Sequence, residues 1–173
     1  MLKKFCVIVL SAAALAWFGG IASAHDYVGA DKCKICHKGE AKGNVWEIWE
    51  KSAHAKSYQT LVDKGDGSEK KTECLTCHVT GLGKATGFDP QAETPNMALA
   101  SVGCEACHGA GSDYKAMSVM KDKAKAIEAG LMIPDEKTCT TCHNDKSPTF
   151  KGFKFDEYWA KIKHPIVKAE KTE

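Results

Sequence analysis

The chain has 173 residues, with 24 lysines, 22 acidic residues and no arginine, so its formal net charge is +2. Recognition of nucleic acid relies on arginine and a basic surface, and this composition therefore argues against a nucleic-acid-binding function. Nine cysteines and seven histidines remain to be explained.

Residues 1–24 are predicted to be a secretory signal peptide that is cleaved. Lys3 and Lys4 precede an apolar run that extends to Ile21, and the small residues Ala-Ser-Ala at 22–24 follow. A membrane anchor is the alternative, because the apolar run is near the lower length limit for a span. The cleavage-like ending favours removal, and hence export to the periplasm of a bacterium.

Residues 25–173 are then expected to form a single domain without a membrane span. Cys6 is removed with the leader, and the 22 lysines that remain balance the 22 acidic residues. The tail from Lys151 to Lys171 is locally basic, and we favour a solvated surface there over a docking surface.

Short helices and loops are predicted in chain order, and no stretch alternates like a strand. Trp46, Trp49, Ala53 and Ser57 recur at helical spacing. The predicted elements are a helix over 43–61, loops over 64–71 and 80–96, a helix over 113–130, and a helix from 155 to 164, where Pro165 follows.

The pentapeptide Cys-x-x-Cys-His occurs four times, as CKICH, CLTCH, CEACH and CTTCH, and contains all eight remaining cysteines. This pattern is the attachment site of c-type haem: two thiols form thioether bonds to the porphyrin, and the adjacent imidazole binds the iron. Four covalently bound haems are therefore predicted. The thioether residues are Cys33, Cys36, Cys74, Cys77, Cys104, Cys107, Cys139 and Cys142, and the proximal iron ligands are His37, His78, His108 and His143.

Zinc is the competing interpretation, because paired Cys-x-x-Cys motifs also bind that metal. Two four-cysteine zinc sites would leave the four adjacent histidines unexplained. A thioredoxin-type dithiol needs only one such motif in a βαβ context, which is absent from the sequence. Haem is the interpretation that uses every motif residue.

Four haems in 149 residues leave too little chain for a separate core around each porphyrin. The haems must then supply much of the buried apolar surface. The predicted fold is mainly α, a multihaem cytochrome c fold with short helices and long loops wrapped around four haems and little or no β structure. The haem-free chain is predicted not to fold.

The distal side of each iron is harder to assign, because only three histidines lie outside the motifs. His54 lies beside the tryptophan stripe with small neighbours, and His164 precedes Pro165 at the end of an aromatic helix, so both are predicted distal ligands. His25 is at the predicted new N-terminus, where fraying is normal, and is a weaker candidate. Histidine alone falls one ligand short.

Methionine is the other common haem ligand. Met117 and Met120 follow the third motif within a predicted helix and are candidate distal ligands, although packing against a porphyrin explains them as well. Met97 and Met132 are weaker candidates. At least one iron is thus predicted to be methionine-ligated or open.

The stretches "CKICHKGEAKGNVWEIWEKSAHAKSYQTL", "CLTCHVTGLG" and "VGCEACHGAGSDY" resemble the tetrahaem cytochrome c-554 family. The resemblance extends from Cys33 to Pro165. It implies a periplasmic, mostly helical electron carrier with closely stacked haem pairs and one vacant iron position, and it implies distal ligation by His54 and His164. Ala110 stands where the family has proline, and Tyr114, Met117 and Met120 occupy the region where a further histidine is expected.

The favoured function is electron transfer between periplasmic redox partner proteins through closely packed haems. The alternative is an enzyme that reduces nitric oxide or another small nitrogen oxide at a five-coordinate haem. No residue can be assigned as a proton donor for such catalysis, so the sequence favours the carrier over the enzyme.

Overall fold

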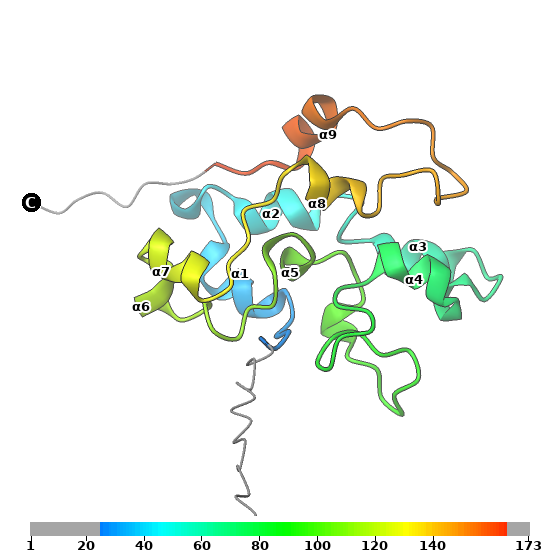
Figure 1. Ribbon diagram of the computed structural model, residues 1–173, viewed down its shortest axis with the longest axis horizontal. Coiled ribbons are helices and arrows are strands. Elements are labelled where there is room, and N and C mark those ends of the chain that lie inside the picture. The colour runs from blue at the N-terminus through cyan, green and yellow to red at the C-terminus, as the bar shows by residue number, and fades with distance from the viewer. Residues whose placement is uncertain (1–24, 166–173) are drawn as a thin grey trace, which may run out of the picture.

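A computed structural model describes residues 25–165 of the chain. The predicted signal peptide, with Cys6, and the end of the basic tail lie outside the described residues. The described part contains nine short α-helices joined by loops and 3₁₀ turns, and Figure 1 shows their arrangement. They are α1 (Asp31–His37), α2 (Val45–Glu50), α3 (Ser57–Asp63), α4 (Thr72–His78), α5 (Cys104–His108), α6 (Met117–Met120), α7 (Lys123–Glu128), α8 (Glu136–Thr140) and α9 (Phe155–Ile162).

The fold class predicted from the sequence agrees with this architecture. No strand forms between residues 25 and 165, and α9 begins and ends close to the predicted boundaries. Over the same residues, no helix combines the length and apolar character needed to cross a bilayer.

The protein core is small and lies at one end of the molecule, where α3 packs against α4 (Figure 1). Its buried residues are Leu61, Leu75, Val79, Phe88 and Leu99. Two backbone hydrogen bonds of 3.0 Å, from Phe88 N to Thr80 O and from Thr80 N to Leu99 O, fold the long loop after α4 back onto these helices. The loop is thus ordered by the cluster that it covers.

Leu61→Ala is expected to destabilise the haem-loaded protein by about 2–5 kcal/mol, because it opens a cavity in this cluster. Leu61 is 2% exposed. The neighbouring Val62 on the same helix is 38% exposed, and Val62→Ala should change the free energy of unfolding by about 0.5 kcal/mol or less. Denaturant unfolding of both variants checks this pair, and equal losses would contradict the assignment of the core.

The single helix predicted over 43–61 is wrong in its middle. Helix α2 ends at Glu50, and α3 begins at Ser57. Val102 lies against the intervening turn: its N–H donates to His54 O at 3.2 Å and to Ser57 Oγ at 2.9 Å, and its carbonyl accepts from Trp49 Nε1 at 2.9 Å. These contacts with a distant segment compete with helical hydrogen bonds and place His54 on a turn.

The helix predicted over 113–130 is also broken. Asp122 has extended backbone geometry and caps α7, because its side chain accepts from Ala124 N at 3.0 Å and from Lys125 N at 3.2 Å. The segment before α6 is held by Tyr114, whose buried hydroxyl donates to Gly109 O at 2.6 Å. Only the end near Gly130 (φ +97°) was predicted correctly.

Candidate haem-binding sites

Each Cys-x-x-Cys-His motif lies on a short helix or extends from one. The first three motifs end α1, α4 and α5, and the fourth begins in α8. Residues three and four apart lie on the same helix face, so one turn presents two thiols and an imidazole together. A capping box formed by Asp135 and Thr138 starts α8, which positions Cys139. None of the eight motif cysteines is joined to another in a disulfide.

The motifs contact one another through their cysteines. The thiols of Cys33 and Cys104 lie in hydrogen-bonding range, which joins the first motif to the third. Cys77 and Cys142 are paired in the same way, and Cys142 Sγ also lies 3.9 Å from Thr76 O. Burial, followed by the nearby Cys142 thiol, raises the pKa of Cys77 to about 11.

Cys107 connects the two pairs. Burial, followed by Cys139 and Cys142, raises the pKa of Cys107 to about 11, so the third motif adjoins the fourth. The motifs therefore follow one another in space in the order first, third, fourth, second. Motif spacing in the sequence does not predict this order.

Two motif histidines have one ring nitrogen held by the backbone. His78 Nδ1 donates to Ser57 O at 2.6 Å, and His108 Nδ1 donates to Met132 O at 3.0 Å. A carbonyl only accepts, so Nδ1 is the donor in both contacts, and Nε2 is the ring nitrogen left to bind a metal. Metal-binding histidines ordinarily have such a second partner, which fixes the tautomer and the ring direction.

The two predicted distal histidines each face a motif histidine. The ring centroids of His54 and His143 are 5.9 Å apart, and those of His164 and His108 are 6.0 Å apart. Two metal–nitrogen bonds of about 2 Å each, with each ring centre roughly 1 Å beyond its nitrogen, place two imidazole centroids about 6 Å apart across one metal ion. Both pairs are therefore far enough apart, and close enough together, that the two imidazoles of each pair could bind one iron between them.

Burial lowers the pKa values of His54 and His164, and neighbouring histidines lower them further. A lowered pKa keeps imidazole neutral at pH 7, and the neutral form binds metal. The environment of both residues thus suits ligation. Their assignment as iron ligands remains a prediction.

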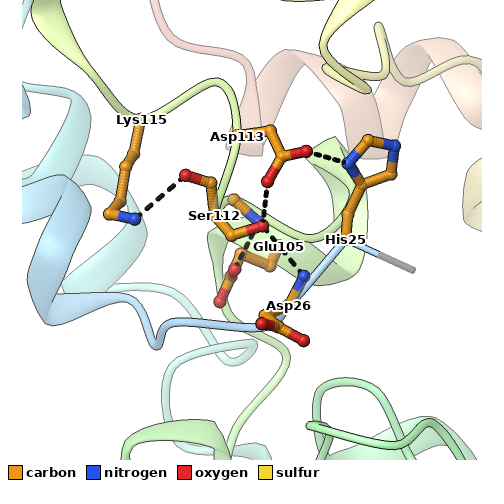
Figure 2. A network of polar contacts seen from close by, with 7 residues as sticks. His25, Asp26, Glu105, Ser112, Asp113 and Lys115 are labelled. Carbon is orange, nitrogen blue, oxygen red and sulfur yellow. Dashed lines mark hydrogen bonds and ion pairs between the residues drawn. The ribbon is translucent and has the colours of Figure 1, made fainter. Parts of the chain in front are cut away.

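His25 lies elsewhere. Its Nδ1 is 2.9 Å from Asp113 Oδ2 (Figure 2). Its side chain also packs on Gly130, where an added Cβ would be 3.0 Å from Nε2. The structure pairs it with this carboxylate rather than with a motif imidazole. All seven histidines lie in the described part of the chain, where neither His37 nor His78 has a second imidazole ring packed across from it.

The methionine candidates have varied exposure. Met117 is 60% exposed and Met120 is half-buried, both on α6. Met97 and Met132 are 60% and 50% exposed. Methionine ligation of any iron remains a prediction.

A buried tryptophan near the first motif also suits a bound cofactor. Trp46 Nε1 is buried and has no hydrogen-bond partner among the described residues, whereas Trp49 Nε1 donates to Val102 O. Lys34 of the first motif lies over the Trp46 ring, 4.6 Å from its centroid. Buried indole N–H groups usually find a partner, and a haem carboxylate is an acceptor of the required kind. The free thiols, the oriented imidazoles and this donor together fit c-type haem.

Glu105, inside the third motif, was not identified as important from the sequence. It is 2% exposed and accepts hydrogen bonds from three backbone N–H groups. No sequence signal distinguishes it from an exposed acid at the same position. The backbone carbonyls of Ser57 and Met132, which hold the motif histidines, were missed for the same reason.

Comparison with known proteins agrees with these features. The family described as cytochrome c554 and c-prime matches residues 32–109. Cytochrome c-554 of Nitrosomonas europaea is 29% identical over 156 residues, which cover 74% of this chain. The chain is thus similar to the cytochrome c-554 family, most clearly over residues 32–109. This similarity supports c-type haem as the group that the Cys-x-x-Cys-His motifs would hold.

The chain spans only 62% of the length of that curated relative. The solved structure of reduced cytochrome c554 from Nitrosomonas europaea has a TM-score of 0.59 and 24% identity, covering 79% of this chain and 82% of that one. This similarity shows that the cytochrome c-554 fold is shared, which confirms the predicted mainly α fold class.

Proposed function

We propose that this protein is a periplasmic electron carrier with four covalently attached c-type haems. The eight motif cysteines would hold the porphyrins, and the four motif histidines would bind the irons from one side. His54 would complete the iron of the fourth motif, and His164 that of the third. Each haem supplies a reversible one-electron centre, and the chain fixes its position and environment.

The spatial order of the motifs carries this proposal. The hydrogen-bonding pairs Cys33–Cys104 and Cys77–Cys142, together with the proximity of Cys107 to Cys139 and Cys142, connect all four motifs into one continuous series. Haems attached to these thiols would have neighbours at every step. An electron accepted at one end could then reach the other end without leaving the protein, which is the requirement for a carrier between two partner proteins.

Haem attachment is expected to follow export, which is consistent with the predicted signal peptide over 1–24 and a single domain over 25–173. Periplasmic redox proteins are the proposed partners.

A second function, small-ligand chemistry, is favoured by the histidine count. His54 and His164 are assigned to the fourth and third motifs, and His25 is bound to Asp113. No histidine then remains as a distal ligand for the irons that His37 and His78 would bind. Two irons would then accept an external diatomic ligand or a methionine. Reduction of a nitrogen oxide would additionally need a proton donor beside the open iron, and no residue of the described chain is assigned to that role.

Carbon monoxide added to the fully reduced protein is expected to bind two of four haems. The pyridine haemochrome assay gives the number of haems per protein, and the amplitude of the Soret change gives the number that bind carbon monoxide. A potentiometric titration gives the number of electrons taken up. Four electrons taken up reversibly support the carrier. Fewer than four haems, or irreversible reduction, would contradict it, and a Soret band that does not respond to carbon monoxide would eliminate the open irons.

A further inference from the structure

A buried negative charge lies within the third motif. Glu105 occupies the position between Cys104 and Ala106 on α5 and is 2% exposed. Figure 2 shows it next to the polar network of His25, Asp26, Ser112 and Asp113. The other acidic residues of that network are exposed, whereas Glu105 is shielded from water.

The hydrogen bonds of Glu105 require a carboxylate. Oε1 accepts from Gly111 N at 2.7 Å and Val28 N at 2.9 Å, and Oε2 accepts from Gly29 N at 2.8 Å and Val28 N at 3.2 Å. Every partner is a donor, so both oxygens act as acceptors and neither can carry a proton toward them. Hydrogen bonds of this kind stabilise the charged form in place of water.

No cation neutralises this carboxylate among residues 25–165. The ion pairs of that region join His25 to Asp113, Lys125 to Asp122 and Lys154 to Glu157. A buried charge without a counterion acts on its surroundings with little screening. The neighbouring tyrosines respond to it: the pKa of Tyr27 is raised by burial and then by Glu105, and that of Tyr114 by burial, Cys33 and Glu105.

The thiols nearest to this charge belong to two motifs. Cys104 is adjacent to Glu105 in the chain, and Cys33 of the first motif contacts Cys104 and also lies in the field of Glu105. A haem held by Cys104 and Cys107, and a second held by Cys33, would therefore lie close to the same carboxylate.

We propose that Glu105 sets the reduction potential of the haem on the third motif and, to a smaller extent, of the haem on the first. The proposal rests on the electron-carrier function above. An iron that gives up one electron to a partner protein gains one unit of positive charge, and a nearby anion stabilises that oxidised state. The carboxylate thereby lowers the potential at which the same iron takes the electron back from a reduced donor. Glu105 itself exchanges no electron or proton in this step.

The competing explanation is purely structural, because Glu105 also fastens residues 28 and 29 to the loop after the third motif. Two substitutions separate the effect of the Glu105 charge from the effect of its hydrogen bonds. Glu105→Gln removes the charge and keeps the size, whereas Glu105→Asp keeps the charge and shortens the reach. Both should weaken the hydrogen bonds, and only Glu105→Gln should change the potential strongly. Glu73→Gln, at an exposed acid directly before the second motif, controls for loss of a surface charge.

Potentiometric titration of each haem-loaded protein, followed by optical and electron paramagnetic resonance spectra, is the measurement. Glu105→Gln is expected to shift one transition to a higher potential by at least a tenfold change in its oxidation equilibrium, or 59 mV for one electron. The shifted transition should belong to the low-spin signal that His164→Ala abolishes. Glu105→Asp and Glu73→Gln should leave every transition near its original value.

An unchanged titration in Glu105→Gln, or an equal shift in Glu105→Asp, would overturn the proposal. If Glu105→Gln does not accumulate with haem, Val28→Lys tests the same field by placing a cation beside the carboxylate. Val28→Lys should raise the reduction potential of the same transition, and Val62→Lys on the distant α3 should leave it unchanged. Equal potentials in these two lysine variants would also overturn the proposal. Irreversible reduction of the unsubstituted protein would instead refute the carrier function.

Discussion

His164→Ala and His54→Ala are each expected to convert one low-spin haem into a high-spin haem. Under the proposed assignment, His164 would share an iron with His108 of the third motif and His54 would share one with His143 of the fourth, because their ring centroids lie 6.0 Å and 5.9 Å apart. Alanine cannot bind iron, so one axial position would be vacated in each variant. Low-temperature electron paramagnetic resonance should show a complete loss of one bis-histidine signal and a gain of one high-spin iron per protein.

His25→Ala is the matched control, because His25 lies on the surface beside Asp113 and does not face a motif histidine. Its spectrum should match that of the unsubstituted protein. The two distal variants should lose different low-spin signals, since they act on different irons. An unchanged spin state in either distal variant would show that its histidine is not a ligand, and a changed spectrum in His25→Ala would assign that residue to an iron.

The haem-free chain is expected to remain unfolded. The described part has one small cluster of buried apolar residues, formed by Leu61, Leu75, Val79, Phe88 and Leu99, all located near the second motif. The first, third and fourth motifs have no comparable apolar cluster beneath them in the described chain. Conformational entropy of the chain opposes folding at every ordered residue, and too little protein surface is buried to offset it.

Replacing all eight motif cysteines by alanine should therefore abolish most of the helical circular dichroism and any cooperative thermal transition. The comparison is with the haem-loaded protein, because both chains share every residue outside the motifs. A single pair of substitutions, Cys139→Ala with Cys142→Ala, should leave the cluster near the second motif folded and disorder α8 and α9. A cooperative transition in the cysteine-free chain would contradict a fold that depends on haem.

The attachment motifs and the mainly helical class could be predicted from the sequence, because both depend on local spacing. Two thiols and an imidazole must be close along the chain to serve one porphyrin, and α9 follows from its aromatic periodicity and Pro165. His54 and His164 were also identifiable as ligand candidates, because so few histidines lie outside the motifs. These inferences need no knowledge of distant contacts.

The pairing of each distal histidine with its motif depended on the tertiary structure, since these contacts join segments 56 to 89 residues apart. Contacts of this kind also explain why two helices were predicted too long. Val102, distant in the sequence, hydrogen-bonds to the turn that interrupts the helix predicted over 43–61. In the helix predicted over 113–130, the Asp122 cap starts a new helix and outweighs helical propensity. Glu105 differs from an exposed acid only in what surrounds it. The sequence by itself determined which residues are candidates for attaching and binding haem, and folding alone decided which of them meet, because burial and long-range hydrogen bonds are properties of the packed chain.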